Sequence, residues 1–229
     1  MAAAKGRTNG FVIGITAAVV VVILALIGLV VWMNNKATDA GPAPKGSIVN
    51  SDTGALTVGK GEDKIALFVD FQCPICKNFE TTYGQQLQGL AKENKITLEY
   101  HPIAILDRYS QNQYSSRSAA AAYCVAQDSS ASTFLDYLNL LFTNQPAENT
   151  AGPTDAQLTD DAKTVGADKA ASCIKDGTFL KYPAAQATSH KIQGTPTIEI
   201  NGERLDLQKS ADTAKFTAFL SKHGVTTGQ

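Results

Sequence analysis

The sequence has little net charge, few aromatic residues and few cysteines, and each shortage excludes a class of protein. Its 229 residues include 20 Lys and Arg against 21 Asp and Glu, so the basic excess of a nucleic-acid-binding domain is missing. Aromatic residues make up 7%, too few for the stacking platforms of single-strand binders. Four cysteines are too few for a cystine-rich fold, and no nucleophile elbow or glycine-rich phosphate loop occurs. We therefore expect no nucleic-acid partner.

Charge is also missing between Arg7 and Lys36, where the sequence has its longest hydrophobic run. Residues 11–33 are 23 nearly continuous apolar positions. A helix of that length spans about 34 Å, enough for the hydrocarbon core of a bilayer. We interpret the run as a permanent single-pass transmembrane anchor. The alternatives are a cleaved signal peptide and a buried core helix, but a signal core is shorter and no convincing small-residue cleavage site follows the run.

The flanks of this run predict its orientation in the cell membrane. Residues 1–10 carry Lys5 and Arg7 and no acid, which keeps them cytoplasmic and places everything after the anchor on the extracytoplasmic side. Residues 34–46 are polar and rich in Gly and Pro, which is typical of a linker. Residues 47–229 then have a normal size for one extracytoplasmic domain.

The apolar pattern of this domain predicts an α/β fold, with a βαβ unit, a helical insertion and a ββα end. The expected elements, in chain order, are a strand at 65–71, a helix from 76 to about 94, a strand at 96–100, four or five short helices within about 104–192, a strand at 197–200, a return strand at 204–207 and a terminal helix. The insertion has almost no strand signal.

The segment Cys73-Pro74-Ile75-Cys76 stands where the first strand gives way to the first helix. Two residues between the cysteines on a first helical turn bring the sulfurs close enough for a reversible disulfide. Pro74 suits the first helical position, where no N–H is needed. Cys73 faces the free N–H groups of the helix start, which favour its thiolate. We predict that Cys73 is the exposed nucleophile and Cys76 the shielded resolving thiol.

Two other interpretations of this motif are half of a zinc site and a purely structural disulfide. Zinc needs a second close pair of Cys or His ligands, but Cys124 and Cys173 lie 49 residues apart and the three histidines are scattered. A structural disulfide in so tight a loop would be strained. Redox chemistry without a metal is therefore our interpretation.

A second motif, Gly194-Thr195-Pro196-Thr197, leads into the late strand. Together with residues 69–76, it makes the chain resemble the thioredoxin fold, and specifically the DsbA-like thiol–disulfide oxidoreductases, over roughly residues 47–229. The resemblance implies that Pro196 is cis and lies against the active-site disulfide. It also implies that the backbone of Thr195 pairs with an extended client segment. Membrane-tethered members of this kind occur among Gram-positive and actinobacterial proteins.

Two positions depart from the family's pattern. Many members carry a buried acid six residues before the first cysteine, where this sequence has Leu67. The most oxidising members have His where this sequence has Ile75. The nearest acid is Asp70, for which we expect a role in a turn or at the surface, with a role as proton acceptor as the alternative. We expect His190 at a solvated helix end and His101 at the end of a strand, and the alternative for each is a position that reaches the active site.

The remaining cysteines, Cys124 and Cys173, fall in the predicted helical insertion. Two thiols that meet on the exported side of a membrane are usually oxidised. We predict a structural disulfide between them, and a bridge closing about 49 residues adds roughly 4 kcal/mol to stability on the chain-entropy estimate. Two separate buried thiols are the alternative.

These observations predict a membrane-anchored oxidase that introduces disulfide bonds into reduced exported proteins through Cys73 and Cys76. The resemblance implies no bound cofactor, and a quinone-linked membrane reoxidase of the DsbB or VKOR kind as partner. A tethered reductase with the same chemistry in reverse is the first alternative. A binding module that holds unfolded chains in the Pro196 groove, with little turnover, is the second.

Overall fold

A computed structural model describes residues 22–29 and 40–225 of the chain, which divides into two compact units, residues 1–39 and 40–229. The described part of the first unit is a helix at 22–29, and its side chains are exposed. Among the described residues, no helix is long and apolar enough to cross a membrane.

Most of the predicted N-terminal organisation falls outside the described residues. The expected cytoplasmic tail, residues 1–10, lies outside them entirely, and so does most of the expected anchor, residues 11–33. Of the expected linker, residues 34–46, the part from residue 40 onward is described and contains bends but no helix or strand.

Within residues 40–225, the second unit contains a five-stranded sheet in the order β1-β3-β2-β4-β5. The strands are β1 (Leu56–Val58), β2 (Lys64–Val69), β3 (Thr97–Pro102), β4 (Thr197–Ile200) and β5 (Glu203–Leu205). β2 and β3 run parallel, whereas the other neighbouring pairs are antiparallel. The central strand β2 is buried at all but its first position, as expected from its apolar run.

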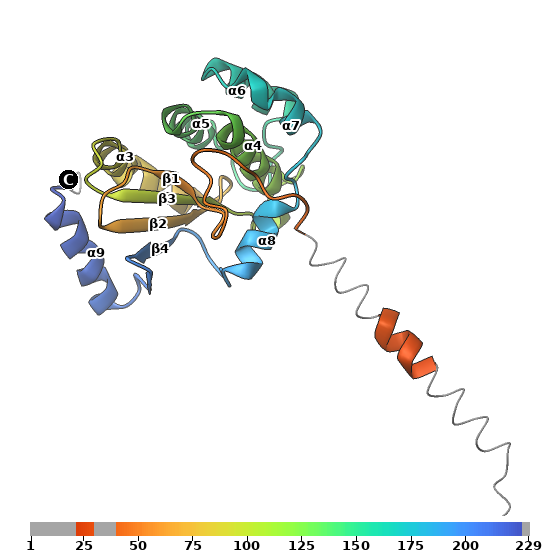
Figure 1. Ribbon diagram of the computed structural model, residues 1–229, viewed down its shortest axis with the longest axis horizontal. Helices are drawn as coiled ribbons and strands as arrows, with labels where there is room; N and C mark the ends of the chain where they lie inside the picture. Colours follow the sequence, from red (N-terminus) through yellow and green to blue (C-terminus); the bar gives the residue numbers. More distant parts are fainter. Residues whose placement is uncertain (1–21, 30–39, 226–229) are drawn as a thin grey trace, which may run out of the picture. The chain divides into compact units, whose positions relative to one another are not determined.

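The helices follow the predicted α/β order. They are α2 (Pro74–Phe79), α3 (Gln85–Lys92), α4 (Tyr114–Asp128), α5 (Ala131–Thr143), α6 (Asp155–Thr164), α7 (Ala171–Lys175), α8 (Tyr182–Ser189) and α9 (Ser210–Lys222), with 3₁₀ turns at Asp107–Tyr109 and Asp168–Ala170. The insertion between β3 and β4 holds α4 to α8 (Figure 1), so the expected run of short helices is confirmed.

The predicted single helix from residue 76 to about 94 is interrupted. A π-helical turn at Glu80–Gly84 separates α2 from α3. A Cβ atom at Gly84 would lie too close to Oε2 of Glu80, so a larger residue at this position would displace that carboxyl group. The apolar spacing of the helix did not reveal this turn.

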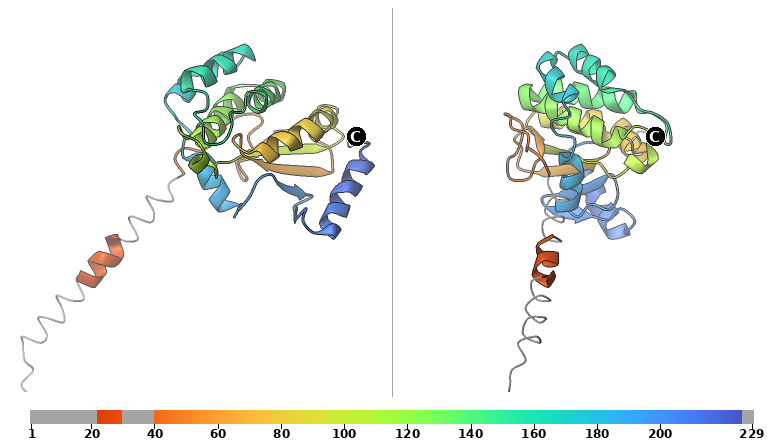
Figure 2. Two further views of the ribbon diagram at one scale, coloured as in Figure 1. Left: turned by 180° about the vertical axis from the view of Figure 1, so that it is seen from behind. Right: turned by 90° about the vertical axis from the view of Figure 1, so that its right-hand side faces the viewer.

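Alternating residues of β2 and β3 divide the core into two parts. Leu67 and Tyr100 are partners across the two strands and face the large core, which includes α3, α4 and α5. Phe68 and His101 are the next pair and stack at 4.2 Å between ring centroids. Phe68 belongs to a smaller core with Ala187 of α8. Figures 1 and 2 show α4 to α7 over one face of the sheet and α8 on the other.

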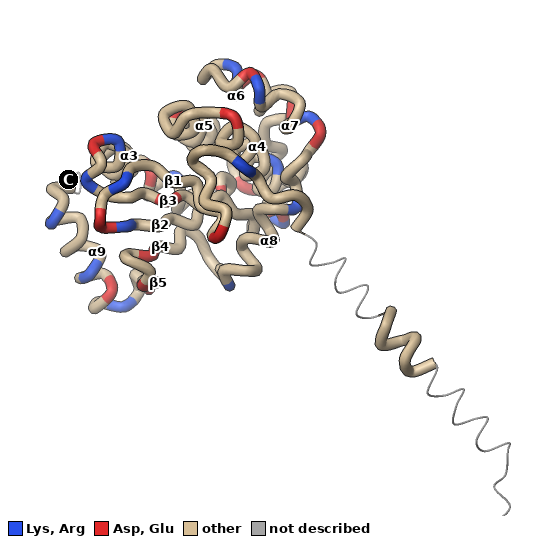
Figure 3. Tube along the Cα trace, in the orientation of Figure 1, with Lys and Arg blue, Asp and Glu red and all other residues tan. Residues whose placement is uncertain are grey.

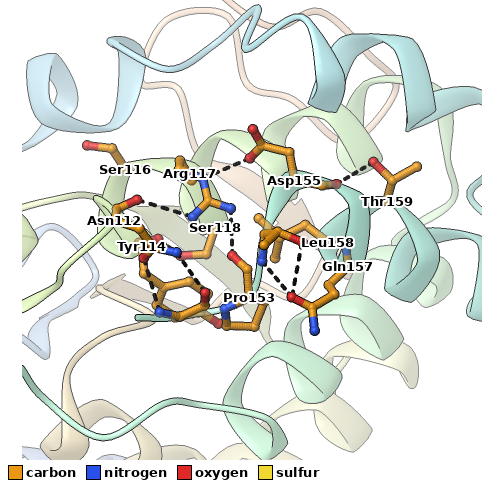
Figure 4. A network of polar contacts seen from close by, with 12 residues as sticks. Asn112, Tyr114, Ser116, Arg117, Ser118, Pro153, Asp155, Gln157, Leu158 and Thr159 are labelled. Atoms are coloured by element: carbon orange, nitrogen blue, oxygen red, sulfur yellow. Dashed lines mark hydrogen bonds and ion pairs between the residues drawn. The ribbon is translucent and has the colours of Figure 1, made fainter. Parts of the chain in front are cut away.

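The segment between α5 and α6 is fixed to the start of α4 by polar contacts (Figure 4). Nε of Arg117 donates to Oδ1 of Asp155 at 2.8 Å, and its Nη1 donates to the carbonyl of Asn112 at 3.1 Å. Nη2 of the same guanidinium donates to the carbonyl of Pro153. One side chain therefore holds the entry to α6 in place.

Charged residues of both signs are mixed along the outer elements. Figure 3 shows Lys and Arg interspersed with Asp and Glu over α6, α7 and α9. Exposed pairs such as Lys163–Asp160 on α6, 2.8 Å apart, contribute little to stability because water screens them. This mixing agrees with the overall charge of −1.

Candidate redox site

The redox motif stands on the turn between β2 and α2. β2 ends at Val69, and Cys73 is the N-cap of α2 in an extended conformation, followed by Pro74 in the first helical turn. The Cys73 N–H donates to the carbonyl of Asp70 at 2.9 Å, and the Cys73 carbonyl accepts the N–H of Lys77 at 3.2 Å. These bonds fix the first cysteine at the helix N-terminus.

Both cysteines of the motif are free thiols, and both are buried. The exposed fraction is 5% for Cys73 and 0% for Cys76. The prediction that Cys73 is exposed is therefore wrong for this structure. The reason is that its Sγ lies against the carbonyl of Thr195, 3.3 Å away. Ile75, between the cysteines, is the exposed member of the motif, at 64%.

The two thiols differ strongly in acidity. The pKa of Cys73 falls from 9.0 to about 6, chiefly because the Cys76 thiol hydrogen-bonds to its sulfur. The side chain of Thr195 and the N–H groups of Cys76 and Ile75 also stabilise the thiolate. Burial raises the pKa of Cys76 well above 9.0, and the neighbouring Cys73 raises it further. Near neutral pH the pair therefore holds one thiolate, at Cys73, and one thiol, at Cys76.

The Thr195–Pro196 loop is brought to the motif by strand pairing. β4 begins at Thr197, whose partner on the antiparallel neighbour β2 is Phe68. The preceding residues therefore lie at the end of the sheet where β2 enters the redox turn. The Thr195–Pro196 peptide bond is cis.

A groove of about 660 Å³ opens beside this loop. Its lining includes Ile75, Thr195, Pro196 and residues 204–209. Leu207 is 42% exposed, so it and Ile75 give the groove two apolar groups open to solvent. Exposed apolar groups around a concave site are typical of surfaces that bind a partner.

Asp70 has a different environment from the one predicted. We expected a turn or surface role, but the side chain is fully buried. One carboxylate oxygen accepts the N–H groups of Ile105 and Leu106 at 2.9 and 3.1 Å and the hydroxyl of Ser115, and the other accepts the N–H of Gln72. Burial raises the pKa of Asp70. Asp70 therefore ties the redox turn to the loop after β3 and to α4.

The sequence reasoning also missed Glu80, which lies one helical turn beyond Cys76. It is buried, and its Oε2 accepts the hydroxyl of Tyr100 at 3.0 Å. Gln88 continues this network by donating to the same hydroxyl at 3.4 Å. Oε1 of Glu80 has no hydrogen-bond partner within the described ranges. Burial raises the pKa of Glu80 from 4.5 to about 7. Only its i+4 spacing from Cys76 could have drawn attention to it.

His101 is buried rather than solvated, whereas His190 is the partly exposed C-cap residue of α8, at a helix end as expected. His101 is 2% exposed and lies in a ring cluster with Phe68 and His190, whose ring centroid is 5.1 Å away. Burial lowers the pKa of His101 to about 3. Nε2 of His190 contacts the carbonyl of Thr53 at 3.0 Å. Within residues 22–29 and 40–225, no three His, Cys, Asp or Glu side chains gather as metal ligands.

The remaining two cysteines form a disulfide within the helical insertion. Cys124 of α4 is bonded to Cys173 of α7, with the Cα atoms 5.7 Å apart. The bridge joins two helices that pack together, and buried alanines before Cys124 leave room for this approach. The structure thus brings Cys73, Cys76, Thr195 and Pro196 together and places this bridge elsewhere.

Comparison with known proteins settles the family. A family model described as thioredoxin matches residues 55–221. The chain belongs to the thioredoxin family. Oxidised DsbA of Mycobacterium tuberculosis is 30% identical, with a TM-score of 0.65 over 74% of this chain and 93% of that one. Reduced DsbG of the same organism is 30% identical, with a TM-score of 0.63 over 81% of this chain and 90% of that one.

Two further relatives share the fold or part of the sequence. MdbA, a thiol-disulfide oxidoreductase from Corynebacterium diphtheriae, shares the fold at 24% identity, with a TM-score of 0.62 over 80% of this chain and 99% of that one. The serine/threonine-protein kinase PknE of Mycobacterium tuberculosis is 35% identical over 130 residues, which is 55% of this chain but 23% of the kinase. The chain thus spans about a quarter of that relative. Within the family, it is a DsbA-like protein disulfide oxidoreductase.

We predict that Glu80 makes the stability of the domain depend on pH. Because its pKa is about 7 in the folded state against 4.5 ordinarily, the folded state binds more protons between these values, and the free energy of unfolding falls as the pH rises through them. Glu80→Gln removes this titration. The free energy of unfolding of the variant, minus that of the unmodified protein, should therefore rise by up to roughly 3 kcal/mol as the pH increases from 4.5 to about 7.

Urea unfolding of the full chain, followed by circular dichroism from about pH 4 to pH 8, measures this difference. Glu93→Gln is the matched control, because the Glu93 side chain is 61% exposed. Parallel pH profiles for Glu80→Gln and the unmodified protein would contradict the prediction.

Proposed function

We propose that this protein is an extracytoplasmic oxidase that introduces disulfide bonds into exported proteins through Cys73 and Cys76. The observation that carries the proposal is the acidity of Cys73, whose pKa is about 6. A stabilised thiolate stabilises the reduced enzyme, and a stable reduced form makes the disulfide a strong oxidant. The same groups at the start of α2 therefore favour electron flow from client to enzyme.

The reaction starts from the enzyme disulfide. A client thiolate attacks Sγ of Cys73, the Cys73–Cys76 bond breaks, and its electron pair remains on Sγ of Cys76. Because the pKa of Cys76 is well above 9.0, that sulfur takes up a proton. A second client thiolate then attacks the client sulfur of the mixed disulfide and releases Cys73 as a thiolate. The client gains one disulfide, and the enzyme holds the two electrons.

The groove beside Pro196 would hold the client during exchange. An extended segment passing Thr195 would lie within reach of Cys73, whose Sγ is 3.3 Å from the Thr195 carbonyl. Strand-like pairing with the backbone of this loop would give affinity without strict sequence demands. Ile75 and Leu207 would contact apolar side chains of the client. Reduced, incompletely folded exported proteins expose such segments.

The sequence supports a location on the extracytoplasmic side of the membrane. Residues 11–33 would be the membrane anchor, residues 1–10 a cytoplasmic tail and residues 34–46 a linker, leaving the catalytic domain, residues 47–229, on the extracytoplasmic side. The reduced enzyme would be reoxidised by a membrane partner of the DsbB or VKOR kind. The bridge between Cys124 and Cys173 would serve stability.

One observation favours the reverse direction, a tethered reductase. Ile75 is uncharged and gives the Cys73 thiolate no stabilising charge between the two cysteines. A less stabilised thiolate makes the disulfide less oxidising and the dithiol a better reductant.

The reduction potential of Cys73–Cys76 separates the two directions. We expect a value close to the DsbA range, about −120 mV, because the Cys73 thiolate is stabilised. Equilibration of the full chain with glutathione buffers, read by counting modified thiols, measures it. A value near the thioredoxin range, about −270 mV, would contradict the oxidase and support the reductase.

The roles of the two cysteines predict different behaviour on substitution. In Cys76→Ser, the Cys73 thiolate can still attack a client disulfide, which forms a mixed disulfide and releases one client sulfur as a thiolate, but the Cys76 thiol that would displace the client from Cys73 is missing. Mixed disulfides with exported proteins should accumulate, visible as bands on non-reducing gels that disappear on reduction. Cys73→Ser is the matched control and should form none. If Cys73→Ser traps clients and Cys76→Ser does not, the assignment of roles is reversed.

A further inference from the structure

The backbone of the redox turn is held by a side chain from the helical insertion. Nε2 of Gln145, just after α5, donates to the carbonyl of Phe71 and to the carbonyl of Cys73, each at 2.9 Å. The side chain is half-buried. The carboxamide of Gln145 therefore binds the carbonyl groups of the residues before and after Gln72, one of which belongs to the nucleophile Cys73.

Neighbouring contacts join the same two segments. Nζ of Lys77 donates to the carbonyl of Thr143 at 3.2 Å, and Nε2 of Gln72 lies 3.5 Å from the carbonyl of Ala147. The rings of Phe71 and Phe142 lie 5.0 Å apart. Residues 143–147 therefore run along the redox turn from before Cys73 to the first turn of α2.

The segment that carries Gln145 is fixed at its far end. Asn112 and Gly152 exchange two hydrogen bonds, with Nδ2 donating to the Gly152 carbonyl at 2.7 Å and Oδ1 accepting the Gly152 N–H at 3.1 Å. The Asn149 N–H donates to the carbonyl of Tyr109 at 2.7 Å. Gln145 is thus presented from a chain segment anchored to α5 at one end and to the start of α4 at the other.

We propose that Gln145 is a positioning residue that orients the peptide group of Cys73 and thereby controls how readily this cysteine ionises. Carbonyl oxygens carry partial negative charge and oppose a thiolate beside them. Donation from Gln145 withdraws part of that charge at the carbonyls of Phe71 and of Cys73 itself. It also holds Cys73 in the extended conformation, φ −80° and ψ 117°, that aims Sγ at the N–H groups of α2.

This role explains why the insertion matters for the chemistry of a motif on the sheet. The N–H groups of Ile75 and Cys76 lower the pKa of Cys73 only while the sulfur faces them. The proposal goes beyond the oxidase function, because it concerns the ionisation of Cys73 whichever way electrons flow.

Two substitutions with opposite expected results test the proposal. Gln145→Met keeps the length of the side chain but removes the donor, and we expect it to raise the pKa of Cys73 by about one pH unit. Gln145→Lys supplies another donor and a positive charge, and the pKa should stay at or below that of the unmodified protein. The reduced full chain is titrated by thiolate absorbance. Gln145→Glu, which keeps the shape of glutamine, is a second donor-free variant and should also raise the pKa.

The redox equilibrium gives an independent reading. With glutathione near pH 7, the higher pKa of Gln145→Met should shift the equilibrium on the order of fivefold toward the enzyme disulfide. Gln111→Met is the matched control, because Gln111 donates to the Asn149 carbonyl of the same segment at 2.8 Å, from the side away from the redox turn. Gln111→Met should leave both the pKa of Cys73 and the equilibrium with glutathione unchanged.

The proposal is overturned if Gln145→Met and Gln145→Lys shift the pKa of Cys73 equally. An equal shift would mean that the loss of glutamine packing, and not the loss of a hydrogen-bond donor, changes the pKa. It is also overturned if neither variant shifts the pKa, or if Gln111→Met has the same effect as Gln145→Met. If the protein proves to be a reductase, only the direction of electron flow changes, and the expected pKa differences between these variants remain the same.

Discussion

The interaction on which the chemistry depends is the stabilisation of the Cys73 sulfur at the start of α2. Pro74 begins the helix directly after this cysteine, so the N–H groups of Ile75 and Cys76 and the Cys76 thiol lie within reach of Sγ. Burial acts in the opposite direction on Cys76 and keeps its proton. One helix start therefore separates two chemically identical side chains into a thiolate and a thiol.

Three distant parts of the chain hold this turn in place. Asp70 binds the loop after β3 through the N–H groups of Ile105 and Leu106. The pairing of β2 with β4 brings Thr195 against the sulfur. Gln145 approaches from the helical insertion. The motif is local in the sequence, but its environment comes from segments that the fold brings together.

The local features could be predicted from the sequence, whereas the buried polar contacts could not. The apolar run of β2 and the turn before Pro74 place Cys73 at a helix start by spacing alone. Asp70 was expected in a turn or at the surface, because three of its four hydrogen-bond partners, Ile105, Leu106 and Ser115, lie at least 35 residues further along the chain. The carboxyl group of Glu80 lies against Gly84 and accepts a hydrogen bond from Tyr100 of β3, and helical periodicity predicts neither contact.

The central claim, that Cys73 alone is the thiolate of the pair, is tested most directly by brief alkylation of the reduced full chain over a range of pH, with the modified residue identified by mass spectrometry. The account predicts modification at Cys73, with a midpoint near pH 6, and an unmodified Cys76 throughout the neutral range. A midpoint near 9.0 for Cys73, or modification that begins at Cys76, would contradict it.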